Sequence, residues 1–433
     1  MRTAAVGAPL LAPDPRVPGR DVLLDAGQMT DRLSRLLGRD GPAGIDRYAR
    51  GRAKYKVGES LRVVHEIEVD GAPWIVASRT FPDGRSEQVY EHALAEAREN
   101  GGPLLGVAHD PELRAVFWTF PNDRKIATLP ALLPATDTVS ALLGRPIART
   151  VLAAYAPEKS ATAACFDELL GRPVAYAKVF ADPDELRVSH RAHTAVFDGL
   201  GTSHSALRVP AVLASSEDDR MLIVEAIQGR SIDAMRGPEQ LDAMRRFGAA
   251  LAAFHGLPVA AGLPRFTRLD PDRLAPAAEL IGRARPDVAV AAARLAGELA
   301  GAAPGRGEAV VVHGDVHHKN GLLQGRRTAL IDLDQTGLGT PAMDLGSALA
   351  GLRYRALVDD EAARGERVGS ALLAGYASAR ELPDRADLDW HVAAALLSER
   401  ALRAVNRVRE DGLAHLGAVL ADARTVLRGD VAR

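Results

Sequence analysis

The chain has 433 residues, which is enough for two or three domains that each bury a core of their own. Hydrophobic residues make up 47% of the chain, as in an ordinary globular protein. The formal net charge is −2, from 54 basic and 56 acidic residues. Because this balance contains no basic excess, we expect no nucleic-acid partner bound through its phosphates.

Cysteine usage and the apolar pattern indicate a cytoplasmic protein without a membrane partner. Cys165 is the single cysteine, which excludes an intrachain disulfide and a cysteine-based zinc site and is typical of a reducing compartment. The mildly apolar N-terminus is interrupted by Pro9, Pro13 and Pro15. No apolar run approaches the ~20 residues that are needed to span a bilayer.

The first part of the chain, after a loose leader, predicts a small unit of helices and strands. The elements expected in it are a helix at 31–37, strands at 61–69 and 74–79, a helix at 88–100 and a strand at 115–120. Residues 61–69 alternate roughly with period two, and Asp70-Gly71 is a typical hairpin turn before the returning strand.

A similar pattern recurs about a hundred residues later in the chain. Strands are expected at 150–155, 161–166 and 174–180. The ranges 55–79 and 155–178 are nearly equal in length, begin with Tyr and end with a basic residue. This similarity suggests two meander-like units. The alternative, that any two hairpins in one chain look alike, is left open by the sequence.

Beyond these strands the pattern becomes helical. A strand at 221–227 precedes Gln228-Gly229, and helices are expected at 238–255, 286–299, 345–350, 361–380 and 387–427. In the first of these helices, apolar residues recur every three or four positions. The last segment offers polar side chains to a bound acceptor: Trp390, Glu399, Arg400, Arg403, Asn406 and Arg407.

The residues with the strongest chemical pattern lie between two short apolar runs, 310–312 and 329–331, which together suggest a small β-ribbon. Asp315 is placed to act as a base, and Asn320 and Asp332 offer oxygen ligands for a hard cation such as Mg²⁺. Phosphoryl transfer needs these parts: a group that accepts the hydroxyl proton and ligands for the metal on the ATP phosphates.

His313-Gly314-Asp315, Asn320, the segment 331–334 and the segment 339–345 together resemble the aminoglycoside phosphotransferase and choline kinase group of small-molecule kinases. Within this group the chain resembles capped bacterial sugar kinases of the malto- or glucosamine-type. The resemblance implies an α+β, bilobal protein-kinase-like fold with an additional N-terminal α/β cap domain. It also implies Asp315 as catalytic base and ATP and Mg²⁺ as cofactors.

The resemblance further implies metal ligation by Asn320 and Asp332, and a buried Asp344 that braces the catalytic loop. Asp334 is either a second metal contact or a strand-end cap. The expected domains are an N-terminal cap at 1–140, a kinase N-lobe at 141–228 and a helical C-lobe at 229–433.

The nucleotide is expected to meet three parts of the N-lobe. Lys178 is expected to contact its phosphates, and its acidic partner is either Glu185 or a group from elsewhere in the chain. The turn at Lys159 and Ser160 is expected to cover the phosphates, although it contains no glycine. The backbone of Glu225 and Ile227 is expected to meet the adenine edge.

The chain is therefore expected to be a kinase that phosphorylates a hydroxyl of a small polar molecule, with a sugar or aminosugar as the first choice. An aminoglycoside-type antibiotic kinase and a peptide Ser/Thr kinase acting with a lyase are alternatives. A catalytically silent nucleotide-binding protein is a further one. The sequence gives no oligomeric state.

Overall fold

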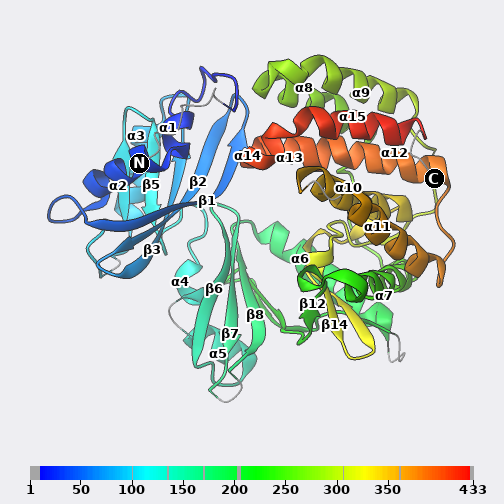
Figure 1. The fold of residues 1–433 in the computed structure, drawn as a ribbon. Coiled ribbons are helices and arrows are strands. Elements are labelled where there is room, and N and C mark those ends of the chain that lie inside the picture. The colour runs from blue at the N-terminus through cyan, green and yellow to red at the C-terminus, as the bar shows by residue number, and fades with distance from the viewer. Residues whose placement is uncertain are drawn as a thin grey trace.

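The computed structural model describes residues 10–99, 101–133, 136–168, 171–201, 206–305, 307–359 and 362–429. Two units built on β-sheets are followed in the chain by a large helical unit (Figure 1). The predicted α+β class is confirmed. None of the helices in these ranges is long and apolar enough to cross a membrane.

The first unit packs helices against a five-stranded sheet. Its elements are α1 (Arg20–Leu24), α2 (Ala26–Leu37), β1 (Ile45–Lys56), β2 (Ser60–Val69), β3 (Ala72–Thr80), α3 (Ser86–Glu96), β4 (Val107–Asp110) and β5 (Ala115–Thr119). Helix α2 buries Met29, Leu33 and Leu37, whose spacing of four places them on one face. Strand β5 is buried along its whole length, because the sheet continues on both of its sides.

The second unit repeats this arrangement. Its elements are α4 (Leu129–Leu132), α5 (Asp137–Leu143), β6 (Arg149–Ala156), β7 (Ser160–Phe166), β8 (Pro173–Phe180), α6 (Pro183–Leu200), β10 (Val212–Ser216) and β11 (Met221–Glu225). The strand orders are β1-β2-β3-β5-β4 and β6-β7-β8-β11-β10, with a helix after the third strand in both. The two predicted meander-like units are therefore confirmed.

Helices α4 and α5 belong to the core of the second unit, although α4 and the first half of α5 lie on the cap side of the expected boundary at residue 140. Leu129, Leu132 and Val139 are buried in one apolar cluster with Ala163 and Ala177 of the second sheet. Helix α4 contacts β7 and β8, and α5 contacts β10. The second unit therefore starts before its first strand.

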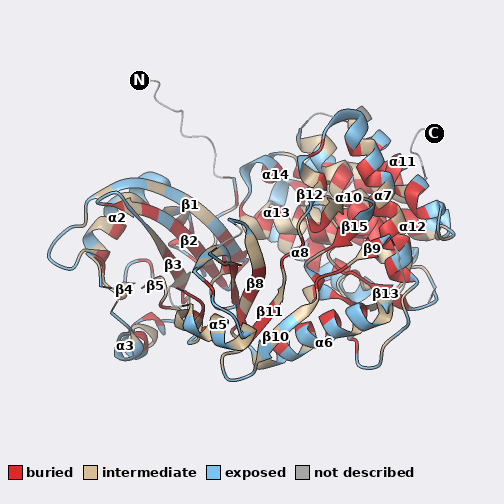
Figure 2. Cartoon of the chain, turned by 90° about the horizontal axis from the view of Figure 1, so that it is seen from below, coloured by how far each residue is buried: buried red, intermediate tan, exposed pale blue. Residues whose placement is uncertain are grey.

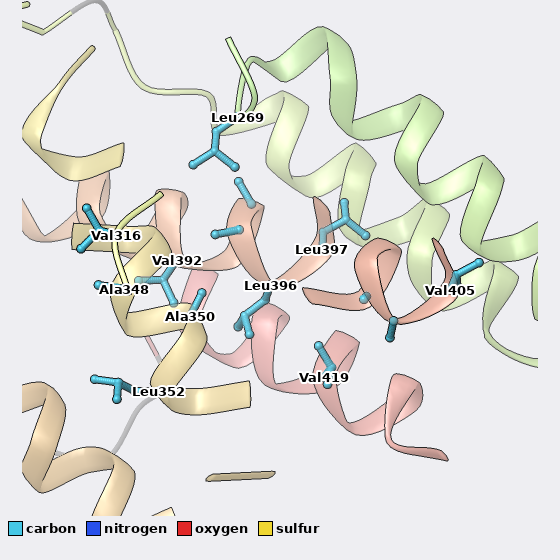
Figure 3. Packing of buried hydrophobic residues seen from close by; sticks show 14 of the residues in the cluster. Leu269, Val316, Ala348, Ala350, Leu352, Val392, Leu396, Leu397, Val405 and Val419 are labelled. Carbon is cyan, nitrogen blue, oxygen red and sulfur yellow. The ribbon is translucent and has the colours of Figure 1, made fainter. Parts of the chain in front are cut away.

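The helical unit holds most of the buried core (Figure 2). Its helices are α7 (Gly237–His255), α8 (Leu274–Ala284), α9 (Ala289–Gly301), α10 (Pro341–Val358), α11 (Ala362–Ala377), α12 (Arg385–Ala395), the π-helix η6 (Leu396–Ala401), α13 (Leu402–Arg407), α14 (Glu410–Ala414) and α15 (Leu416–Leu427). Leu396 and Leu397 of the π-helix pack in this core with Val419 of α15 (Figure 3). Helix α8 was not among the expected helices.

Short strands form two small sheets around the predicted site residues: β9 (Leu207–Arg208), β12 (Arg230–Ser231), β13 (Val310–Val312), β14 (Gly321–Gln324), β15 (Arg327–Leu330) and β16 (Gly337–Gly339). The expected ribbon between the two apolar runs is wrong, since β13 pairs with β16 and β15 pairs with β14. Gly325, with φ +54°, allows a tight turn that returns the chain directly from β14 to β15. Strand β15 therefore pairs with β14, which is adjacent to it in the sequence, and not with β13.

The first unit also reaches the helical unit. Strand β1 contacts α13, and the two lie side by side in the centre of Figure 1. Arg50 of β1 lies 4.0 Å from Glu410 of α14. Residues more than 350 positions apart therefore share one surface.

Candidate active site

A buried carboxylate holds the loop that follows β13. Asp344 of α10 is 1% exposed and accepts hydrogen bonds from the backbone N–H groups of His313, at 2.7 Å, and Gly314, at 2.9 Å. His255 lies 3.0 Å from the same carboxylate and 2.9 Å from the hydroxyl of Tyr376. Burial raises the pKa of Asp344, but His255 and the backbone bonds hold it below its usual value. The expected bracing role of Asp344 is confirmed.

Asp315 presents its carboxylate to solvent from this braced loop. Its side chain is 26% exposed, with the guanidinium of Arg268 at 3.8 Å and the ring of His317 at 3.7 Å. The amide nitrogen of Asn320 donates to the backbone carbonyl of Asp315 at 3.1 Å. Because this bond uses the nitrogen end of the amide, the Asn320 oxygen remains as a possible cation ligand.

Asp332 combines a strained backbone conformation with a carboxyl group whose pKa is raised. Its backbone has φ 64° and ψ 61°, a left-handed conformation that costs energy for a residue other than glycine. Burial and the neighbouring charge of Asp334 raise the pKa of Asp332, although Lys178 opposes this shift. A cation beside Asp332 would relieve this repulsion, so the site fits a metal ion.

The structure answers the question of the Lys178 partner. Lys178 on β8 forms an ion pair with Asp334, which also accepts a hydrogen bond from the Ser189 hydroxyl of α6 at 2.5 Å. Glu185 lies instead 3.9 Å from Lys159. Burial raises the pKa of Asp334, but the Lys178 ammonium holds it below its usual value. A group from outside the N-lobe therefore orients Lys178.

A cavity of about 680 Å³ lies between the second sheet and the catalytic segments. It is lined by most of the residues expected at the nucleotide and the metal: Ser160, Lys178, Glu225, Ile227, Asn320, Asp332 and Asp334. Leu222, Leu322 and Ile331 add apolar surface, which suits a flat aromatic base. Lys159 lies outside it and lines a neighbouring cavity of about 510 Å³.

Another cavity, of about 550 Å³, opens on the side of Asp315. It is called the second cavity below, and the cavity of about 680 Å³ is called the first cavity or the nucleotide cavity. Arg50 and Arg52 of β1 line the second cavity together with Arg403 and Arg407 of α13. Sequence reasoning offered Arg403 and Arg407 for the acceptor but missed the arginines of the first unit. Trp390, also offered, is buried and donates to the carbonyl of Leu299 at 2.8 Å, so it belongs to the core.

The donor set at the end of the first cavity suits Mg²⁺. The side-chain oxygens of Asn320 and Asp332 are hard ligands, and Mg²⁺ is usually bound through one or two carboxylates together with substrate phosphates. Within the described ranges, no group of three or more His, Cys, Asp and Glu side chains is placed to hold a metal ion. Asp334, the other candidate ligand, is engaged by Lys178 and Ser189.

Residues 178–391 match the family model described as the phosphotransferase enzyme family. This match covers Lys178 and both catalytic segments, and it confirms the resemblance seen in the sequence motifs. No curated protein matches the chain.

Solved structures of small-molecule kinases are similar to this chain at low identity. A microcompartment-associated aminopropanol kinase is 20% identical, with 66% of this chain and 94% of that chain covered and a TM-score of 0.49. A putative fructosamine-3-kinase from Thermobifida fusca is 22% identical, with coverages of 68% and 98% and a TM-score of 0.42. An amicoumacin kinase, in complex with AMP-PNP, Ca²⁺ and Ami, is 15% identical, with coverages of 65% and 88% and a TM-score of 0.47.

Proposed function

We propose that this chain, whose residues 178–391 match the model of the phosphotransferase enzyme family, transfers the terminal phosphate of ATP to a hydroxyl of a small polar molecule. The observation that carries the proposal is the meeting of two cavities at the catalytic loop. Lys178, Asn320 and Asp332 line the first cavity, and Asp315 lines the second. A phosphate donor in the first cavity and a hydroxyl acceptor in the second would therefore face each other.

In this proposal Asp315 accepts the proton of the attacking hydroxyl. Arg268 and His317, at 3.8 and 3.7 Å, orient its carboxylate. Lys178, fixed by Asp334, donates to the nucleotide phosphates. Asn320 and Asp332 would hold Mg²⁺, which when bound neutralises phosphate charge. The backbone of Glu225 and Ile227 would meet the base.

The acceptor is proposed to be of the sugar class. Its cavity is lined by β1 of the first unit and by α13, which supports the idea that the first unit is an N-terminal cap that completes the acceptor site over the two lobes. An aminoglycoside or a Ser/Thr peptide remains an alternative acceptor for the same catalytic groups.

Replacing Asp315 with Asn tests the proposal. General-base catalysis typically contributes about 10²- to 10⁴-fold, so single-turnover phosphate transfer to an acceptor found by ADP release should fall by that factor. Binding of AMP-PNP with Mg²⁺ should be unchanged, because Asp315 does not line the nucleotide cavity. An Asp315→Asn variant that transfers phosphate at the wild-type rate would remove the assigned base.

A further inference from the structure

The cavity beside Asp315 is unusually rich in arginine. Five arginines line it, and they come from both ends of the chain: Arg50 and Arg52 on β1, Arg403 and Arg407 on α13, and Arg409 just beyond. We propose that the hydroxyl acceptor carries an anionic group, a phosphate or a carboxylate, which these arginines bind while Asp315 receives the hydroxyl proton. This inference rests on the proposed function, because it deepens the assignment of this cavity to the acceptor.

The positive charge of this cavity is not balanced by the protein. Asp315 is the one acidic residue in its lining, and Glu410 lies at 4.0 Å from Arg50. Among the residues that the structure describes, Arg52, Arg403 and Arg407 have no carboxylate within 4.0 Å. Guanidinium groups are the residues of choice for planar recognition of carboxylate and phosphate. A ligand is therefore the natural counter-charge.

The arginines also repel one another. Burial and the charges of Arg52, Arg403 and Arg409 lower the pKa of Arg407 to about 10. Partial burial and the charge of Arg403 likewise lower the pKa of Arg52. A bound anion would reverse this mutual destabilisation, whereas a polycationic aminoglycoside would increase it. Within the sugar class, the cavity thus favours an anionic member over an aminosugar.

The geometry separates this site from the nucleotide phosphates. Arg52 lines both cavities, but Arg50, Arg403 and Arg407 line the second cavity alone. Arg403 and Arg407 are four residues apart on one helix, so they share a face, and Arg50 approaches from β1. Their side chains can therefore clamp one anionic group beside the catalytic loop.

The first experiment measures anion binding with AMP-PNP and Mg²⁺ held at saturation, so that the nucleotide cavity is closed to the probe. Inorganic phosphate should then raise the melting temperature of the wild-type chain. The double variant Arg403→Gln/Arg407→Gln should bind phosphate at least about tenfold more weakly, because each lost charged hydrogen bond costs about that factor. The control Arg47→Gln/Arg326→Gln removes the same charge from exposed positions and should bind phosphate as the wild type does. Equal phosphate binding by the cavity variant, or no binding by the wild type, would overturn the proposal.

The second experiment measures ADP release with glucose, glucosamine, glucose 6-phosphate and gluconate as acceptors. The two anionic sugars distinguish a phosphate from a carboxylate requirement. We expect an anionic sugar to have the higher kcat/KM and to lose this preference in the cavity variant; a neutral or cationic sugar with the higher kcat/KM would contradict the inference. No ADP release with any of these acceptors, from a chain that still binds phosphate in the first experiment, would count against the proposed kinase and not against the anion site. If AMP-PNP does not bind, the proposed kinase fails, and the phosphate measurement is then made without nucleotide on the same variants.

Discussion

Asp332 and Asp334 lie two residues apart, but their pKa values are shifted in opposite directions. Burial and the charge of Asp334 raise the pKa of Asp332, whereas Lys178 outweighs burial and keeps the pKa of Asp334 low. A carboxyl group whose folded pKa is raised costs stability when it is ionised. A carboxyl group whose folded pKa is lowered contributes stability that disappears as the pH falls through that pKa. Asp332 therefore destabilises the ligand-free protein at neutral pH, while Asp334 stabilises it.

The two Asp→Asn variants should consequently change stability in opposite directions. At pH 7, Asp332→Asn should raise the melting temperature of the ligand-free chain, and Asn also tolerates the left-handed backbone well. Asp334→Asn should lower it, because Lys178 loses its partner. Both variants should lose at least about 100-fold in phosphate transfer, since phosphoryl transfer depends on metal ligands and on an ordered lysine. Thermal melts without ligand check the opposite signs, and a destabilised Asp332→Asn chain would contradict them.

His65 gives a pH dependence that is unrelated to catalysis. It is 0% exposed, with Tyr48 Oη at 3.0 Å and Ser78 Oγ at 2.8 Å, and burial lowers its pKa from 6.5 to about 3. Below pH 6.5 the His65 side chain binds a proton in the unfolded chain but stays neutral in the folded one. The free energy of unfolding therefore falls as the pH is lowered towards 3.

Replacing His65 with Gln should remove this contribution. As the pH falls from 6.5 to 5, the wild type should lose stability more steeply than the His65→Gln chain, and the difference in slope should approach about 1.4 kcal/mol per pH unit, which is the effect of one proton. His92, exposed on α3, supplies the control, and its Gln variant should keep the wild-type slope. Denaturant unfolding at several pH values measures the slopes. Equal slopes for wild type and His65→Gln would show that His65 protonates in the folded state.

Among the elements, the two similar sheets differ in the turn that follows their first strand. In the first unit this turn contains Gly58, with φ +73°; in the second the matching residue is Glu158, with φ 59°. Glu158 is buried and forms ion pairs with three arginines, Arg62 and Arg79 of the first unit and Arg124 of the connection. The strained turn beside the nucleotide cavity is therefore fastened to the first unit.

Neutralising Glu158 should loosen this connection. Glu158→Gln leaves three arginines without their shared carboxylate, and breaking a buried ion pair typically costs about 3 to 5 kcal/mol. Affinity for AMP-PNP should also fall, because Ser160, which begins β7 directly after this turn, lines the nucleotide cavity. Glu59→Gln, at the exposed turn of the first unit, should change neither quantity. Chemical denaturation and nucleotide titration measure both, and a Glu158→Gln chain as stable as wild type would show that the network contributes little.

The elements differ in how far the sequence predicted them. Helix α7 and strands β2, β3 and β8 were predicted almost to their ends, because their apolar residues follow a clear period. Strand β1, with the sequence IDRYARGRAKYK, was not bounded, because it exposes charged residues on much of its length. Its strand character comes from pairing with β2, which no local pattern reports.

At the scale of the whole molecule, local motifs predicted the catalytic groups, and tertiary contacts decided the rest. Asp315, Asn320 and Asp332 lie within eighteen residues, so their spacing could be seen in the sequence. The pairing of Lys178 with Asp334 joins residues 156 positions apart, and the arginine cavity joins β1 to α13. These contacts depend on how three units pack together, which no pattern along the chain encodes directly.

The most direct test of this account is a crystal structure of the chain with AMP-PNP and Mg²⁺. We expect the nucleotide in the cavity of about 680 Å³, with the metal bound by Asn320 and Asp332 and the terminal phosphate directed towards Asp315. A nucleotide bound elsewhere, or a metal held by other side chains, would contradict it.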